Sequence, residues 1–186
     1  MLSNKSLQRK DKPEVYRLCT FPFGGIRLTF KELAAYQMWT GNKMREVVEH
    51  LKEKEFTKKV VGQQSVRSIC EHIVGALATC FNIADDKWDD GIYKWIAQAS
   101  KLEMISKWSE LDARLTEVVR EIPQGTIKVP HISDEPFEIQ AMDFFIQYIL
   151  HTTHHRGQLA SALRLLGKDV PGTDYLMFFR ERASVS

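Results

Sequence analysis

The most regular feature of this sequence is a set of four stretches in which apolar residues recur every three or four positions. Residues at this spacing share one face of an α-helix, so each stretch predicts an amphipathic helix. The four predicted helices cover Thr29–Leu51, Ser65–Phe81, Ser100–Ile122 and Phe137–Leu166. Residues 126–129 are compatible with an extended conformation, but no sheet is predicted.

Local signals mark several ends of these helices. Two segments, Thr29-Phe-Lys-Glu32 and Ser100-Lys-Leu-Glu103, fit capping boxes, in which the hydroxyl caps the helix and the glutamate reaches back. Pro123 interrupts the third predicted helix, and Gly167 provides a C-terminal cap for the fourth. The charged segment 52–64 is expected to link the first two helices.

Four long helices with no convincing strands and no internal repeat predict an all-α protein built as a four-helix bundle. Residues 1–27 are expected to form an irregular N-terminal segment, residues 28–179 the bundle, and residues 180–186 a C-terminal tail. The stretch 174–179 is too apolar to remain in solvent and is expected to pack back on the bundle. The acidic connection before the third helix is expected to include a helical turn around Trp95.

Size and composition are those of an ordinary globular domain. The chain has 186 residues, 44% of them hydrophobic and 27% charged, which is enough to build a hydrophobic core. The net charge of +2 is too small to indicate nucleic acid or an anionic membrane as a partner. No apolar stretch reaches the ~20 residues that span a bilayer, and the polar first residues do not resemble a signal peptide.

The three cysteines, Cys19, Cys70 and Cys80, are odd in number and show no CxxC spacing. This pattern predicts reduced thiols in or near the core rather than a disulfide framework. Because no export signal is recognisable either, we expect a cytoplasmic protein.

Candidate chemistry is concentrated in His151-Thr-Thr-His154-His155-Arg156-Gly157-Gln158, within the fourth predicted helix. Because residues four apart lie one helical turn above each other, His151 and His155 are expected about 6 Å apart on one face. Two imidazoles in this register can share one metal ion. Gly157 costs about 0.5–1 kcal/mol in a helix interior, which favours close approach of a neighbouring backbone there.

A site with three ligands needs a further donor from another helix, and His72 is the best candidate. It lies midway along the second predicted helix in an apolar setting, where an imidazole without a partner would be costly. His50 is expected at the surface, His131 in a loop, and His154 is rotated about 60° from His151 on the helical wheel. The alternative is that the HxxxH pair arises by chance and that His72 is a hydrogen-bonded core residue.

Three neutral imidazoles favour zinc or nickel over iron, copper or cobalt. Three protein ligands also leave coordination positions open, as in catalytic zinc sites. Residues 152–154 contain no glutamate, so the HExxH motif of zinc proteases is excluded. Gln158 and Tyr148 share the ligand face and could orient water or substrate, with helix packing as the alternative for Tyr148. Arg156 and Arg164 could neutralise an anionic substrate, although a solvated helix face is the default for both.

Three motifs carry a family resemblance: His151-x-x-x-His155-Arg156-Gly157-Gln158 continued by Leu163-Arg164-x-Leu166-Gly167, then Tyr36-x-x-Trp39-x-x-Asn42, then Ile69-x-x-His72-Ile73. They resemble, in that order, the C-terminal signature, the first helix and the second helix of the DinB-like superfamily. The resemblance covers residues 28–179.

This resemblance implies a bundle of up-down-down-up order, often in a homodimer, with a divalent metal ion held by His72, His151 and His155. Characterised relatives include metal-dependent transferases and isomerases that use low-molecular-weight thiols such as bacillithiol, mycothiol or glutathione. The hypothesis that follows is a thiol S-transferase acting on a small-molecule substrate. The alternative is a non-catalytic bundle, stabilised by the ion, that serves in stress response or dimerisation. DNA binding, which the family name suggests, finds no support in the charge balance.

Overall fold

The computed structural model of the chain describes residues 30–120, 124–130 and 135–184. The predictions for segment 1–27, for the Thr29 cap and for His131 lie outside these residues. Four long helices occupy the four predicted stretches, and the remaining elements are short. The long helices are α1 (Phe30–Glu49), α3 (Val66–Ala84), α5 (Lys101–Arg120) and α6 (Ala141–Leu165).

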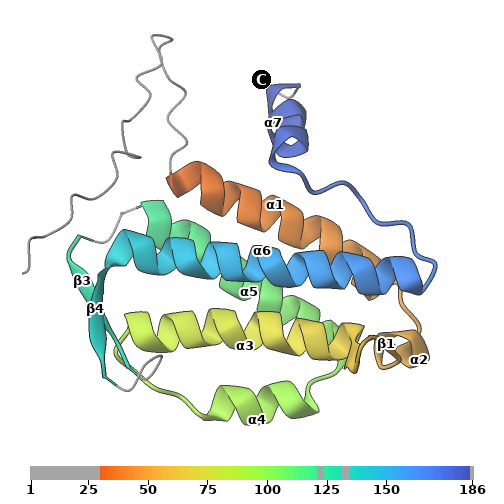
Figure 1. The fold of residues 1–186 in the computed structure, drawn as a ribbon, viewed down its shortest axis with the longest axis horizontal. Coiled ribbons are helices and arrows are strands. Elements are labelled where there is room, and N and C mark those ends of the chain that lie inside the picture. The colour runs from red at the N-terminus through yellow and green to blue at the C-terminus, as the bar shows by residue number, and fades with distance from the viewer. Residues whose placement is uncertain (1–29, 121–123, 131–134, 185–186) are drawn as a thin grey trace, which may run out of the picture.

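The four long helices form the predicted bundle. Helices α1 and α3 each pack against both α5 and α6, so α1 and α3 occupy opposite corners. Figure 1 shows α1 and α6 running in one direction and α3 and α5 in the other, which is the up-down-down-up order. The antiparallel pairing of α1 and α5 is visible in one contact, because Lys101 Nζ donates to the carbonyl oxygens of Glu49 and Leu51.

The parallel course of α3 and α5 requires the chain to return between them, and α4 (Gly91–Gln98) makes that return along the outside of α3 (Figure 1). The predicted helical turn around Trp95 is therefore a helix of eight residues. It is amphipathic, and its buried residue is Ile96. This short helix covers a face of α3 that α5 and α6 leave open, which becomes important for the candidate site.

The structure contains two short hairpins that the sequence pattern did not predict. The charged link holds the one-turn helix α2 (Glu53–Phe56) and strands β1 (Lys59–Val61) and β2 (Gln64–Ser65). Strands β3 (Thr126–Val129) and β4 (Phe137–Gln140) pair antiparallel ahead of α6. The predicted start of the fourth helix at Phe137 is thus wrong. Residues 137–140 alternate in type (Phe-Glu-Ile-Gln), and pairing with β3 satisfies their backbone groups.

Helix ends follow the local signals where these are described. Ser65 caps α3 by accepting from Ser68 N, and Ser100 and Glu103 form the predicted box at α5, with Glu103 Oε2 accepting from Ser100 N at 2.8 Å. Gly167 adopts φ 71°, the left-handed conformation of a C-terminal cap, just after α6.

The apolar C-terminal stretch packs back on the bundle, as predicted. It forms α7 (Tyr175–Ala183), whose Phe178 is buried against the rings of Tyr36 and Trp39 on α1. Trp39 Nε1 also donates to Glu181 at 2.9 Å. Cys70 and Cys80 are buried free thiols of α3, also as predicted, and burial raises the pKa of Cys70 to about 12. Cys19 lies outside the described residues.

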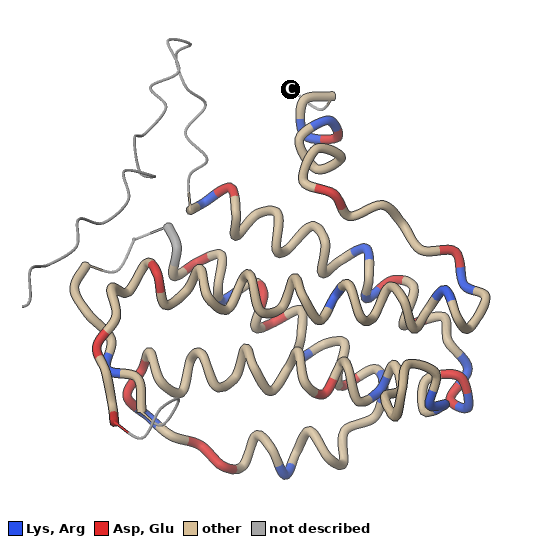
Figure 2. Tube along the Cα trace, in the orientation of Figure 1, with Lys and Arg blue, Asp and Glu red and all other residues tan. Residues whose placement is uncertain are grey.

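Charges of both signs are spread over the described part of the molecule (Figure 2). Several of these charges form ion pairs, such as Arg114 with Asp85 and Lys168 with Glu55. None of the described helices is both long enough and apolar enough to cross a membrane.

Candidate metal centre

The three predicted histidines meet on two facing, antiparallel helices. His151 and His155 lie one turn apart on α6 with ring centroids separated by 4.5 Å. His72 of α3 faces both, at 5.4 Å from the ring of His151 and 4.2 Å from that of His155. One ligand nitrogen from each residue falls within 4.8 Å of the other two, so the cluster could hold a metal ion.

The spacing of the ring nitrogens matches what one ion requires. His151 Nε2 lies 3.3 Å from His72 Nε2. Nitrogen ligands at about 2.0–2.1 Å from a tetrahedral zinc ion are separated from each other by roughly 3.3–3.4 Å. The arrangement also tolerates other divalent ions, since imidazole suits nickel, copper and iron as well as zinc. The donor set therefore fits a metal ion without large movement of either helix.

Hydrogen bonding distinguishes the two adjacent histidines of α6. His155 Nδ1 lies 2.7 Å from Gln158 Oε1, and an amide oxygen can only accept, so Nδ1 carries the proton. The lone pair of His155 is then on Nε2, as in metal-ligating histidines that donate their other N–H to a fixed acceptor. Gln158 Nε2 contacts His154 Nε2 at 3.2 Å. His154 is exposed and outside the cluster, whereas His155 belongs to it.

The environment of the cluster favours the neutral form of His72 and His151. Burial lowers the pKa of His151, and the neighbouring His155, His72 and His154 lower it further because each disfavours a second positive charge. Burial and His155 likewise lower the pKa of His72. Neutral imidazole is the form that binds metal. The alternative reading of His72 as a hydrogen-bonded core residue does not hold, because its side chain is exposed beside a cavity.

A cavity of about 700 Å³ opens beside the cluster. His72 and His151 line it directly, and α3, α4, α6 and the β3–β4 hairpin form its walls. This volume lies within the usual range for small-molecule sites, roughly 300–1,000 Å³. The lining is mostly apolar. Its apolar and aromatic members are Gly75, Ala76, Tyr93, Ile96, Val129, Phe137, Ile139, Phe144 and Tyr148.

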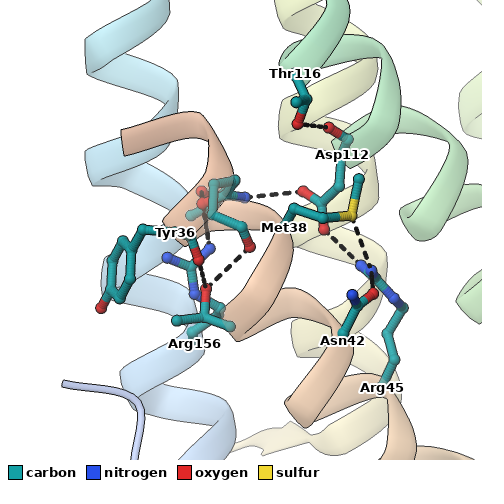
Figure 3. A network of polar contacts seen from close by, with 10 residues as sticks. Tyr36, Met38, Asn42, Arg45, Asp112, Thr116 and Arg156 are labelled. Atoms are coloured by element: carbon teal, nitrogen blue, oxygen red, sulfur yellow. Dashed lines mark hydrogen bonds and ion pairs between the residues drawn. The ribbon is translucent and has the colours of Figure 1, made fainter. Parts of the chain in front are cut away.

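The opposite face of α6 enters a buried polar network (Figure 3). Gln37 of α1 is its centre: Gln37 Nε2 donates to Asp112 Oδ1 of α5 at 2.9 Å, and Gln37 Oε1 accepts from Arg156 and Thr152 of α6. Arg45 of α1 pairs with the other oxygen of Asp112 at 2.5 Å. Each of these five residues is buried. Burial raises the pKa of Asp112, and the guanidinium of Arg45 opposes that shift.

This network overturns one expectation about α6. Arg156 does not lie on a solvated helix face, because only 3% of it is exposed. Its guanidinium also donates to Thr153 Oγ1 at 2.6 Å. Asn42 of α1 is exposed and accepts a hydrogen bond from Arg45 at the edge of the network. Arg164 is exposed, as expected.

Gly157 does not have the role that the sequence predicted, and Gly41 of α1 does have a close neighbour. A Cβ on Gly157 would meet nothing within 4 Å, so no neighbouring backbone approaches there. A Cβ on Gly41 would come within 2.3 Å of Asp112 Oδ2 and 2.8 Å of Arg45 Nη1. Because Gly41 has no side chain, α1 leaves room at this position for the buried Arg45–Asp112 ion pair.

The sequence pattern missed Gln37 and Asp112 as important residues. A signal was present, because Asp112 falls between Trp108, Leu111 and Leu115 on the apolar stripe of α5. A carboxylate at such a position is almost never buried without a partner. It therefore predicts a buried cation or amide, but the sequence does not say which one.

The fold and the cluster define a four-helix bundle with three histidines converging from two of its helices. The DinB family model matches residues 26–183, which is most of the chain, and the protein belongs to the DinB family. The expected family is thereby confirmed.

Among solved structures, the chain is similar to a crystal structure from Exiguobacterium sibiricum 255-15, whose description places that protein provisionally in the DinB family. The TM-score is 0.59 and the identity 15%, over 77% of this chain and 95% of that one. At this identity the likeness supports the fold alone. None of the curated proteins matches the chain significantly.

Proposed function

We propose that the protein is a metal-dependent enzyme that transfers a low-molecular-weight thiol to a small electrophile, with His72, His151 and His155 holding a zinc or nickel ion. One observation carries the proposal: three imidazoles converge at the edge of a cavity of about 700 Å³. A purely structural metal site is usually closed by a fourth protein ligand. Among the described residues, these three histidines form a site of three donors beside a space large enough for a substrate.

The residues around the cluster have different roles in such a site. Gln158 fixes the tautomer and ring orientation of His155 through its carbonyl oxygen. The apolar walls keep water from the part of the substrate inside the cavity. When bound, a divalent ion lowers the pKa of a coordinated thiol or water, which is the chemistry it would supply.

Transfer of a thiol to an alkyl halide gives a balanced reaction. The sulfur forms a bond to the carbon, the carbon–halogen bond breaks, and the halide leaves with the electron pair. The thiol proton passes to solvent. No oxidant or reductant is needed, so the two substrates and the site are sufficient.

The test is turnover of monochlorobimane with a panel of thiols: bacillithiol, mycothiol and glutathione. Protein reconstituted with zinc or nickel is expected to accelerate the reaction with at least one thiol, and chelated protein or His155→Ala is not. His50→Ala, which removes an exposed imidazole outside the cluster, serves as the control and is expected to retain activity. Turnover that survives loss of the metal would overturn the mechanism.

The same samples distinguish an enzyme from a metal-stabilised bundle. If the melting temperature falls strongly on chelation while no thiol reacts above the uncatalysed rate, the ion joins α3 to α6 without catalysis. A homodimer, which the family resemblance implies, stays a prediction for the same preparations.

A further inference from the structure

The histidine cluster has two different sides. His72 and His151 line the cavity, whereas His155 does not. Beyond His155 lie the exposed His154 and the half-buried Gln158, both polar. A molecule that reaches the cluster through the cavity therefore meets an apolar wall, and one that reaches it past His154 meets solvent and polar side chains.

The cavity offers little to a charged ligand. Glu71 is its charged lining residue, and its carboxylate already accepts from Arg67 Nε at 2.7 Å. The hydroxyl of Thr79 donates to the carbonyl oxygen of Gly75 at 2.8 Å and lies 2.6 Å from the hydroxyl of Tyr93, from which it can accept. An anionic group inside this space would lose its hydration, face the carboxylate of Glu71 and find no lining cation in return.

The space is large enough for more than one ring. A cavity of about 150 Å³ is sufficient to hold benzene. The cavity beside the cluster measures about 700 Å³, and aromatic walls from two elements, Phe137 of β4 and Phe144 of α6, face it. Aromatic walls favour flat apolar ligands through offset or edge-to-face contacts.

We propose that the cavity takes an uncharged, apolar electrophile of fused-ring or aryl size, while the polar thiol reaches the cluster from the side of His154 and Gln158. The assignment of two substrates to two sides deepens the proposed function and rests on it. The apolar site itself does not depend on turnover. Ala76 of α3, whose small side chain lines the cavity four residues beyond His72, is a position where a larger side chain would reduce the free volume.

A pair of fluorescent probes tests the site without requiring activity. N-phenyl-1-naphthylamine is uncharged, and 1-anilinonaphthalene-8-sulfonate has the same ring skeleton with a sulfonate. The full-length protein without bound metal is expected to bind the uncharged probe more tightly by at least about tenfold, because the sulfonate must be desolvated opposite Glu71 and no metal cation offsets that cost. Glu71→Gln is expected to narrow this difference several-fold.

Substitution of Ala76 locates the probe. Ala76→Phe fills the cavity and is expected to weaken binding of the uncharged probe by about tenfold or more while leaving the zinc content unchanged. Leu165→Phe is the matched control, because Leu165 is 65% exposed on α6 and does not line the cavity. If Ala76→Phe does not fold, the two probes and Glu71→Gln still decide the question.

The outcomes separate this inference from the proposed function. Equal binding of the two probes by the wild type, or undiminished binding by a folded Ala76→Phe variant, would overturn the apolar site. Selective binding of the uncharged probe with no thiol turnover would leave the apolar site standing and contradict the transferase. With turnover, 4-nitrobenzyl chloride is expected to react faster than 4-(chloromethyl)benzoate, and the reverse order would refute the substrate assignment.

Discussion

Two faces of α6 carry polar side chains that differ in the kind of partner they contact. On one face, Arg156 and Thr152 enter a network in which donors meet acceptors: guanidinium, amide and carboxylate groups from α6, α1 and α5 satisfy one another (Figure 3). On the other face, His151 and His155 meet His72, which is a group of the same kind. The charged and hydrogen-bonding groups of the first set find complementary partners within the set, whereas the three imidazoles of the second set do not.

This difference separates a structural polar cluster from a candidate binding site. Complementary groups in a closed interior fix the register of helices, because any partner removed leaves a buried group unsatisfied. Three imidazoles facing one another offer each other no opposite charge. The cluster could hold a shared cation, which would complete this set of groups.

The largest effect is expected from breaking the network at its carboxylate. Asp112→Ala would leave the buried guanidinium of Arg45 without its partner and Gln37 Nε2 without its acceptor. Loss of one partner of a buried ion pair costs about 3–5 kcal/mol. Denaturant unfolding of the metal-free protein is the measurement.

A double variant sharpens that result. Arg45→Met combined with Asp112→Leu removes both charges and is expected to be more stable than Asp112→Ala alone, because no uncompensated charge is left at the pair. A loss below about 1 kcal/mol in Asp112→Ala would show that the network does not hold the helices together as described.

Two helical glycines, Gly41 of α1 and Gly157 of α6, are expected to give smaller effects on stability, of opposite sign. Gly41→Ala places a Cβ against the Asp112–Arg45 pair and is expected to destabilise the protein by about 1–3 kcal/mol. Gly157→Ala, on the same chain and in the same type of helix, meets open space and is expected to stabilise it by about 0.5–1 kcal/mol. Thermal and denaturant unfolding of both variants check the signs, and two equal values would contradict the geometry.

The smallest effect on stability, with a clear effect on metal binding, is expected at Gln158. Gln158→Leu removes the acceptor of His155 Nδ1 and is expected to weaken zinc binding by about 10–100-fold. His154→Phe keeps that acceptor and is expected to leave the affinity close to that of the wild type. Competition with a zinc-binding dye measures both, and equal weakening by the two substitutions would contradict the role of Gln158.

The helices could be predicted from the sequence because each depends on a local period. The apolar stripes of α1, α3 and α5, the box at Ser100 and the cap at Gly167 all involve residues within one or two turns. The start of α6 could not be predicted, because residues 137–140 form a strand only by pairing with β3. Four residues with two apolar positions fit either a helix or a strand.

The candidate site was predictable in part for a similar reason. His151 and His155 share a helix, and His72, 79 residues before His151, followed from the need for a third donor and from the family motif. Gln37 and Arg156 are 119 residues apart and form a pair that no local pattern indicates. The cavity was equally hidden, because its walls come from α3, α4, α6 and a hairpin that forms only in the folded chain.

We propose that imidazoles from α3 and α6 hold one metal ion between them. The most direct test is elemental analysis of purified protein after exposure to zinc or nickel and removal of free metal, for the wild type and for His72→Ala. We expect about one tightly held ion per wild-type chain, and we expect a folded His72→Ala variant to lose the ion. A wild type that retains no ion, or a variant that retains its full complement, would contradict it.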